Sequence, residues 1–266
     1  MDSNTARQRM RRWILWHSAF LLTGLMLMFC QLQAQALRVA ISAEDYPPFY
    51  YQHGDTLSGL SVEVLQGVAA ELGLTLQWQR LPWSRVVQHV ASGKADVITV
   101  FYKTEPRQAQ FYYSNESYLR DPIVLLCAEP CQLRFDGDLA SLAQQPVAVV
   151  RDFSYGPRLD QAAFSKIAVV ESDPMLFKLL LNRRLPQGIA SLITVQHAAE
   201  LQQAGDKIRV LQPPLDYVDI YFAFSKQSNI TPQFVRQFDQ ALLRYKSSAA
   251  YSTLLQRYQL AYPQQP

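Results

Sequence analysis

Histidine and cysteine are both scarce in this chain of 266 residues, with four and three copies respectively. Outside the N-terminal segment, the histidines His53, His89 and His197 are scattered singly along the sequence. A structural zinc site normally needs four ligands placed close together. The sequence therefore predicts no metal and no cofactor.

An excess of charge is also lacking, because 25 basic residues face 22 acidic ones. Residues 1–36 hold four of the basic residues and one of the acidic ones, so the rest of the chain carries 21 of each. A protein that binds nucleic acid needs a basic surface for the phosphate backbone. We therefore expect no nucleic-acid partner.

Long apolar runs are absent except for one, at residues 13–29. Four arginines precede this run and Ala34-Gln35-Ala36 follows it, which is the order typical of a secretory signal. We predict a signal peptide at residues 1–36, cleavage after Ala36 and a soluble product in the periplasm. The alternative is an uncleaved membrane anchor, because the run is at the short limit for spanning a bilayer.

Cys127 and Cys131 remain after such processing, and Ala128-Glu129-Pro130 separates them. Export places them in an oxidising compartment, where disulfides form and persist. We expect a short-loop disulfide, with two free thiols as the alternative.

Apolar residues alternate between the period of a strand and that of a helix along most of the chain. Strands are predicted at 37–41, 74–78, 96–100, 147–150, 167–170 and 188–194, and helices at 62–72, 84–91, 156–164 and 174–182. This alternation is typical of α/β sheets covered by helices on both faces.

A composite motif lies between Gly93 and Tyr118. It reads Gly93-x-x-Asp96, then Thr104-Glu105-x-Arg107, then Ser114-x-x-x-Tyr118, and upstream it is preceded by Tyr46-Pro47-Pro48-Phe49 and the segment 59–65. In this order the motifs resemble the extracytoplasmic solute-binding proteins of polar amino-acid transporters, family 3.

The resemblance implies a type II periplasmic-binding-protein-like fold, with two α/β lobes joined by two hinge crossovers. We expect lobe 1 at residues 37–124 and 217–266, and lobe 2 at residues 125–216. The crossovers are expected at 117–126 and 217–224. Thr231 and Pro232 then predict the start of a helix that returns to lobe 1.

Arg107 is the predicted anchor for a ligand carboxylate, as the resemblance implies. A guanidinium is always charged and offers a planar fork of donors that matches a carboxylate. The alternative is an arginine in an ordinary surface salt bridge.

The loop before this arginine departs from the family, because it has large aromatic residues where small hydroxyl residues are usual. Ligand pockets are mostly apolar with a few placed polar groups. Five aromatic residues are therefore candidates for stacking on a ligand, each with core packing as the alternative: Tyr46, Phe49, Trp83, Phe101 and Tyr102.

The expected lobe 2 turn reads Arg151-Asp-Phe-Ser-Tyr-Gly156. Ser154 is predicted to cap a helix and to donate to the ligand, with capping alone as the alternative. Asp152 stands where the family usually has glycine, which leaves the geometry of the turn open.

The acidic residue that receives the ligand's ammonium in amino-acid binders is missing. Its position falls on Pro186, Ser191 or Gln196, and no acidic residue occurs from 174 to 199. A desolvated ammonium needs a counter-charge. Either Glu44, Asp45 or Asp152 supplies it, or the ligand has no α-amino group.

The sequence thus predicts a monomeric binding protein, and not an enzyme, that captures a small carboxylate-bearing solute for an inner-membrane ABC permease or a sensor. Two alternatives remain open. One is a signalling component that has lost transport. The other is an enzyme similar to cyclohexadienyl dehydratase on the same fold, since fold alone does not establish chemistry.

Overall fold

A computed structural model describes residues 36–260 of the chain. The segment 1–35, which holds nearly all of the predicted signal peptide, lies outside the described residues, as do residues 261–266. Cleavage after Ala36 therefore stays a prediction. In the described part of the chain, no helix has the length and apolarity that crossing a bilayer requires.

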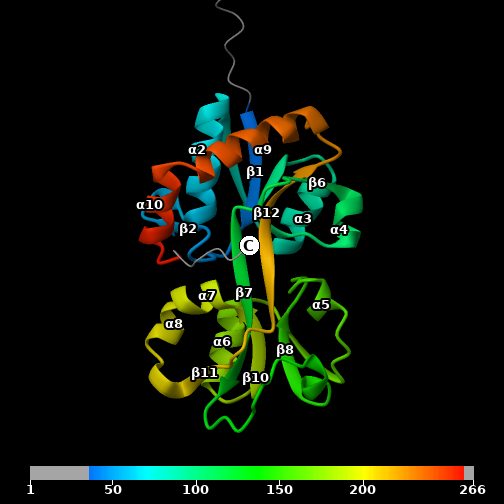
Figure 1. The fold of residues 1–266 in the computed structure, drawn as a ribbon, viewed down its shortest axis with the longest axis vertical. Helices are drawn as coiled ribbons and strands as arrows, with labels where there is room; N and C mark the ends of the chain where they lie inside the picture. The colour runs from blue at the N-terminus through cyan, green and yellow to red at the C-terminus, as the bar shows by residue number, and fades with distance from the viewer. Residues whose placement is uncertain (1–35, 261–266) are drawn as a thin grey trace, which may run out of the picture. The chain divides into compact units, whose positions relative to one another are not determined.

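The strands form one large sheet and one small hairpin, β2–β3 (Figure 1). The large sheet runs in the order β4-β1-β5-β12-β7-β10-β8-β9, and β6 and β11 pair beside β12 and β7. The strands are β1 Ala36–Ser42, β2 Tyr51–His53, β3 Thr56–Ser58, β4 Thr75–Leu81, β5 Val97–Tyr102, β6 Phe111–Tyr113, β7 Leu119–Ala128, β8 Pro146–Val150, β9 Lys166–Val170, β10 Gln187–Ser191, β11 Ile208–Val210 and β12 Asp216–Ser225.

Helices follow most of the strands, as the alternating pattern predicts. The α-helices are α2 Leu60–Leu72, α3 Trp83–Ala91, α4 Glu105–Gln110, α5 Pro157–Asp160, α6 Asp173–Leu181, α7 Leu192–His197, α8 Ala199–Gln202, α9 Pro232–Lys246 and α10 Ala249–Arg257. Two short 3₁₀ helices are η1 Leu139–Leu142 and η2 Gly205–Lys207.

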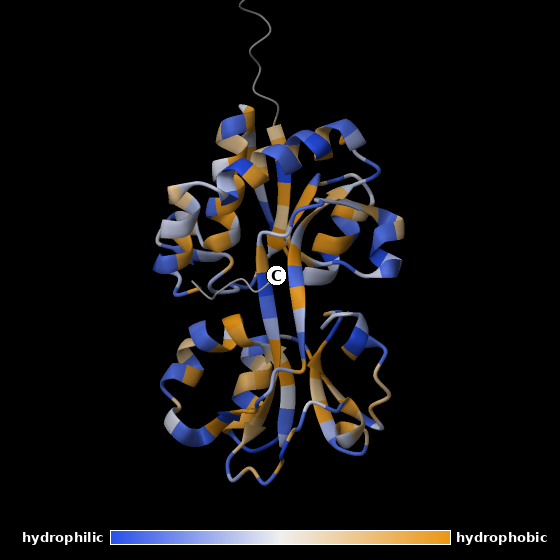
Figure 2. Ribbon diagram, in the orientation of Figure 1, coloured by the Kyte–Doolittle hydropathy of each residue, from blue (hydrophilic) through white to orange (hydrophobic). Residues whose placement is uncertain are grey.

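Lobe 1, built from β1–β6, α2–α4, α9 and α10, has a buried core on each face of its sheet. One core holds apolar residues of β1, α2, α9 and α10, and the other holds residues of α3 and β5. The predicted βαβ unit is present, because β1 pairs with β4 in parallel from Ala36↔Thr75 to Ser42↔Leu81. In Figure 2 apolar residues lie on both strands and helices, and the helices carry hydrophilic residues as well.

Lobe 2, built from β8–β11 and α5–α8, repeats this layering around its own strands. One core gathers Leu142, Val147 and Leu159, and the other gathers Val150, Phe177 and Leu180. Each face of a sheet needs an apolar cover, and the two lobes bury largely separate cores, although Ile193 of α7 joins a core of lobe 1.

Two long strands, β7 and β12, run through both lobes (Figure 1). They pair with each other antiparallel from Asp216↔Ile123 to Ile220↔Leu119. Beyond this stretch β12 pairs with β5 in lobe 1, and β7 pairs with β10 in lobe 2. The two crossovers expected from the sequence are therefore neighbouring strands of one ribbon.

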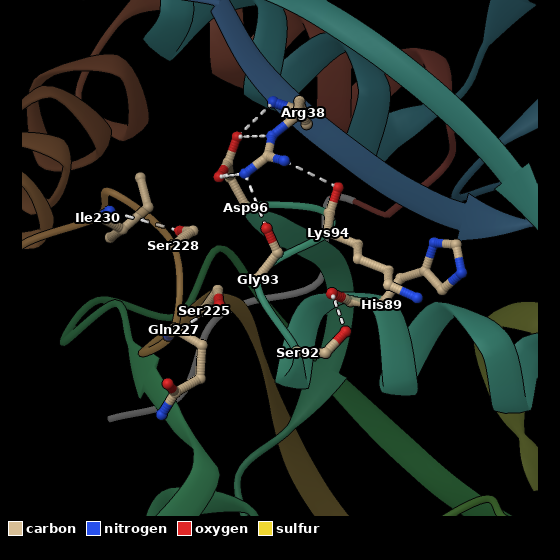
Figure 3. Close-up of polar contacts among 10 residues, drawn as sticks. All are labelled: Arg38, His89, Ser92, Gly93, Lys94, Asp96, Ser225, Gln227, Ser228 and Ile230. Atoms are coloured by element: carbon tan, nitrogen blue, oxygen red, sulfur yellow. Dashed lines mark hydrogen bonds and ion pairs between the residues drawn. The ribbon is translucent and has the colours of Figure 1, made fainter.

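The Gly93-x-x-Asp96 part of the motif stabilises the fold of lobe 1 (Figure 3). Arg38 on β1 pairs with Asp96 through Nη2–Oδ1 at 2.6 Å and Nε–Oδ2 at 2.9 Å. Burial alone would raise the pKa of Asp96, but the hydrogen bonds from Arg38 lower it overall. Gly93 has φ 76°, and a Cβ there would lie 2.4 Å from the carbonyl oxygen of Gln227, so only glycine fits.

Two predicted elements are wrong in extent, whereas one predicted cap is confirmed. The helix expected at 156–164 is only α5, four residues long, and the strand expected at 188–194 stops at Ser191, where α7 begins. Ser191 caps α7 by accepting a hydrogen bond from the Thr194 backbone N–H. The Thr231 side chain caps α9 as predicted, by accepting from the Phe234 N–H.

Candidate functional site

A cavity of about 90 Å³ lies between the two lobes. Its walls come from the segments that follow the carboxyl ends of β1, β4 and β5 in lobe 1 and of β8, β9 and β10 in lobe 2. Ligands of open α/β sheets bind at the carboxyl ends of the strands. A space of this size has room for several water molecules or for one small solute.

Arg107 lines the cavity from α4, whose first turn holds Glu105 and Pro106. Its guanidinium lies over the Phe101 ring, with Cζ 4.0 Å from the ring centroid. It donates to two backbone carbonyls, Tyr102 O at 3.2 Å and Asp152 O at 3.5 Å. No carboxylate among residues 36–260 lies within ion-pair distance of it, and burial lowers its pKa.

Aromatic rings surround this guanidinium. Trp83 lies 6.0 Å from Phe101 and 5.8 Å from Phe153, measured between ring centroids. Tyr46 contacts Phe153 edge to face, with 6.2 Å between the ring centroids, so aromatic rings of the two lobes pack against each other. The structure thus brings four of the predicted aromatic residues to the cavity wall: Tyr46, Trp83, Phe101 and Tyr102.

Phe49 does not line the cavity, which corrects its prediction as a ligand contact. Its side chain is 0% exposed and packs in the lobe 1 core. It stacks beneath Tyr46 at 5.3 Å between ring centroids. The physical reason is the turn at 46–50, where Tyr46 faces the cavity and Phe49 faces the sheet.

In the lobe 2 turn, Asp152 adopts φ 60°, in the left-handed region that glycine favours. This conformation leaves the Asp152 carbonyl free to accept from Trp83 Nε1 at 3.4 Å as well as from Arg107. One backbone oxygen of lobe 2 thereby contacts two predicted ligand residues of lobe 1.

Ser154 lines the cavity, but it is not the N-cap of the helix that follows. Gly156 occupies the N-cap position of α5. The Ser154 hydroxyl donates to Asp160 Oδ2, and Asp160 Oδ1 accepts from the Tyr155 N–H at 2.8 Å. The capping prediction is therefore wrong, and a ligand role for Ser154 stays a prediction.

A second polar group of the site surrounds Asp121, a fully buried residue of the crossover strand β7. Asp121 accepts from the Tyr102 hydroxyl at 2.7 Å and from the Ser191 hydroxyl at 2.9 Å. Tyr102 belongs to lobe 1, whereas Ser191 belongs to lobe 2. Burial raises the pKa of Asp121 to about 7, although these hydrogen bonds act to lower it.

Asp173 is the residue that sequence analysis missed. It is the first residue of α6, it lines the cavity and it is only 4% exposed. Burial, together with the negative charge of Asp121, raises its pKa to about 7. An acid in the first turn of a helix usually interacts with the helix dipole at the surface, so no signal in the sequence marked it as a cavity residue.

The acids that the sequence offered as substitutes are placed less favourably. Asp45 lines the cavity, but it pairs with Arg80 at 2.6 Å. Glu44 lines the cavity from an exposed position, and the Asp152 side chain is exposed and absent from the lining. Among residues 36–260, no group of three or more histidine, cysteine, aspartate or glutamate residues is placed to hold a metal ion.

The arrangement as a whole, two α/β lobes around a cavity that carries an arginine, defines a two-lobed solute-binding protein. The family model of bacterial extracellular solute-binding proteins, family 3, matches residues 37–261. The chain therefore belongs to this family, and the resemblance stated from the motifs is confirmed.

Known relatives are distant in sequence but similar in fold. A probable amino-acid-binding protein of Bacillus subtilis, YxeM, is 20% identical over 226 residues, which cover 84% of this chain and 83% of the relative. A histidine kinase sensor domain with similarity to periplasmic binding proteins superposes with TM-score 0.75 at 14% identity, over 85% of this chain and 96% of that one. An ancestral arginine-binding protein bound to glutamine superposes with TM-score 0.71 at 17% identity, over 86% and 99%. The fold is that of type II periplasmic binding proteins.

Proposed function

We propose that this protein captures a small carboxylate-bearing, amino-acid-like solute in the cavity between its lobes. The two lobes would close around the solute by bending at β7 and β12. Their predicted bounds are residues 37–124 with 217–266 for lobe 1 and residues 125–216 for lobe 2. A family of solute-binding proteins and the name of the Bacillus subtilis relative support the amino-acid class.

The single observation that carries the proposal is the environment of Arg107. This half-buried guanidinium lines a cavity, and its partners within residues 36–260 are an aromatic face and two carbonyl oxygens. Buried charges are normally paired, and a carboxylate is the partner that fits a planar fork of donors. The ligand would supply this missing counter-charge.

Titration calorimetry on Arg107 variants tests the proposal, with L-amino acids and simple carboxylates as probes. Arg107→Ala should weaken binding by about 2–5 kcal/mol, because it leaves a desolvated carboxylate unpaired. Arg107→Lys keeps the charge but loses the fork, so it should restore only part of the affinity. Arg244→Ala is the matched control, since Arg244 is an exposed arginine paired with Glu71. Unchanged affinity in folded Arg107→Ala would remove the carboxylate from the proposal.

We further propose that the protein is monomeric, works in the periplasm, binds no nucleic acid, and delivers its ligand to an inner-membrane ABC permease or a sensor. The basic, apolar and small-residue order of residues 1–36 supports export. Intact mass of the protein from a Gram-negative periplasm should correspond to a chain cleaved after Ala36. A membrane-bound species that keeps residues 13–35 would contradict this expectation.

An enzyme on the same fold is the second candidate, and one observation favours it. Asp121 and Asp173 are buried carboxyl groups whose pKa is raised by burial to about 7, which suits general acid or base catalysis near neutral pH. We expect binding without turnover, so bound carboxylates should be recovered unchanged in NMR spectra after long incubation. A time-dependent product that is lost in Asp173→Asn would favour the enzyme.

A further inference from the structure

The carboxyl group of Asp173 has no partner in the part of the chain that the structure describes. It lines the cavity at 4% exposure, and no hydrogen bond or ion pair joins it to any residue between 36 and 260. Buried polar groups are almost always hydrogen-bonded, and a buried charge without a partner costs several kcal/mol. A group outside the protein is therefore needed to satisfy this carboxyl group when it is ionised.

Among residues 36–260, no basic group contributes to the pKa of Asp173, which burial and the charge of Asp121 raise. Burial raises the pKa values of four tyrosine hydroxyls, and the charge of Asp173 raises them further: Tyr46, Tyr50, Tyr102 and Tyr155. Asp121 is already satisfied by the Tyr102 and Ser191 hydroxyls. Within residues 36–260, the carboxyl oxygens of Asp173 thus face the cavity lining without a basic side chain paired to them.

The other acids along the cavity are not available in this way. Asp45 and Glu171 are held by Arg80 and Arg151 at 2.6 Å and 2.9 Å. Glu44 is exposed, where water solvates its charge. Ser191, one of the positions expected for the acid, instead donates its hydroxyl to Asp121. Among the described acids that line the cavity, Asp173 alone is both buried and unpaired.

We infer that Asp173 is the subsite for a cationic group of the ligand, an ammonium carried by the same molecule whose carboxylate Arg107 holds. This inference rests on the proposed function. It answers whether another acid replaces the missing one or the ligand lacks an α-amino group. The ligand is an amino acid or another amine-bearing carboxylic acid, and its counter-charge comes from the start of α6 instead of from the last strand of lobe 2.

Proton release gives this subsite a signature of its own. Since burial and Asp121 raise the pKa of Asp173 to about 7, the free protein holds a proton on this carboxyl group below neutral pH. An ammonium beside the carboxylate lowers that pKa, so binding should expel the proton. Calorimetry in two buffers of different ionisation enthalpy should therefore detect proton release near pH 6, and less of it in Asp173→Asn, where Asp121 remains as a buried carboxyl group with a pKa of about 7.

The deciding experiment uses the wild-type protein and matched probes: the common L-amino acids, the same carboxylic acids without the amino group, and the same amines without the carboxylate. We expect an amino acid to bind at least about thirtyfold more tightly than its deaminated counterpart. Equal or tighter binding of the deaminated acid would overturn the subsite and leave the Arg107 proposal intact. Binding of the amines alone would support Asp173 and contradict Arg107. No binding of any probe at millimolar concentration would overturn the inference.

Variants then assign the effect to one residue. Asp173→Asn should weaken the best amino acid by about thirtyfold to several thousandfold and leave its deaminated counterpart unaffected. Asp206→Asn, on the exposed η2, is the control for the same change in net charge. Equal weakening of both probes by Asp173→Asn would show a general structural role and overturn the subsite. The matched probes on wild type give an answer even if Asp173→Asn fails to fold.

Discussion

Arg107 and Asp173 both line the cavity, and the free protein accommodates their opposite charges by different means. Arg107 rests on the Phe101 ring and donates to carbonyl oxygens, so part of its hydrogen-bonding capacity, but not its counter-charge, is met without a ligand. Asp173 has no donor among residues 36–260, and burial raises its pKa to about 7, which favours the protonated form below neutral pH. The proposed anion site therefore carries its charge at any physiological pH, whereas the proposed cation site gains its charge only as the carboxyl group loses its proton.

Removing both charges is expected to have the largest effect. Each single change removes one partner of a desolvated ion pair, which typically costs about 2–5 kcal/mol. Arg107→Ala combined with Asp173→Asn should therefore abolish measurable binding of any amino acid that the wild type binds. A double-mutant cycle by calorimetry is the measurement. If the double variant had the same affinity as Arg107→Ala, and Asp173→Asn alone had the affinity of the wild type, then of these two residues only Arg107 would contact the ligand.

The pH dependence of the free energy of unfolding should next distinguish Asp173 from Arg107. A carboxyl group whose pKa is raised in the folded state stabilises the protein fully below its unfolded pKa, and this stability is lost as pH rises through about 7. Asp173→Asn removes the loss, so it should raise the free energy of unfolding at pH 8 by up to about 4 kcal/mol and change it little at pH 4. Urea denaturation at both pH values measures this. A variant that is equally less stable at both would show that Asp173 is a structural acceptor.

Tyr102→Phe should have a smaller effect, which acts through the buried carboxyl group of Asp121. It removes the 2.7 Å hydrogen bond to Asp121, which acts to lower the pKa of that carboxyl. We expect the pKa of Asp121 to rise further, and the stability above pH 7 to fall by about 1.5–3 kcal/mol. Carboxyl carbon shifts in an NMR titration measure the pKa. Tyr113→Phe is the control, because the Tyr113 hydroxyl donates to the neutral Tyr102 carbonyl at 3.2 Å. An unchanged Asp121 pKa would contradict the prediction.

Removal of the disulfide, which lies away from Arg107 and Asp173, should affect stability and not affinity. The structure joins Cys127 and Cys131, in and just after the lobe 2 end of β7, by a disulfide. Closing so short a loop contributes about 2 kcal/mol in the chain-entropy model. The Cys127→Ser, Cys131→Ser double variant should lose that much stability and keep its affinity. Alkylation of the unreduced, denatured and cleaved wild type should find no free thiol, and two thiols would rule the bond out.

The regular strands and helices could be predicted because the spacing of apolar residues distinguishes a strand from a helix along the chain. Five strands and the helices α2, α3 and α6 follow the predicted alternation closely. The errors lie where side chains redirect the backbone near the cavity. The β-branched residues Ile193 and Thr194 favour a strand, but the Ser191 hydroxyl caps a helix there. Asp160 accepts from the turn before it, and α5 ends at that residue.

The site was only partly predictable, for the same reason. The motif around Arg107 and the aromatic residue Trp83 are local signals, and the structure brings both to the cavity. Asp173 has no such signal, because Ser172-Asp173-Pro174 is an ordinary helix start. Its pKa depends on burial and on the charge of Asp121 of β7, and its own charge acts on Tyr46 of lobe 1 and Tyr155 of lobe 2, so these groups come together only in the folded protein. Only the tertiary structure makes it a candidate.

The pairing of β7 with β12 also limits how the cavity can open. A single linking strand can bend and twist in any direction, but two hydrogen-bonded strands resist bending within the plane of their ladder. The soft direction is across the face of the ribbon, so the lobes should swing apart about one axis without sliding past each other. Under such a motion Arg107 and Asp173 separate along a fixed path, and the length of a bound solute, measured from carboxylate to ammonium, would set the angle at which the lobes stop closing.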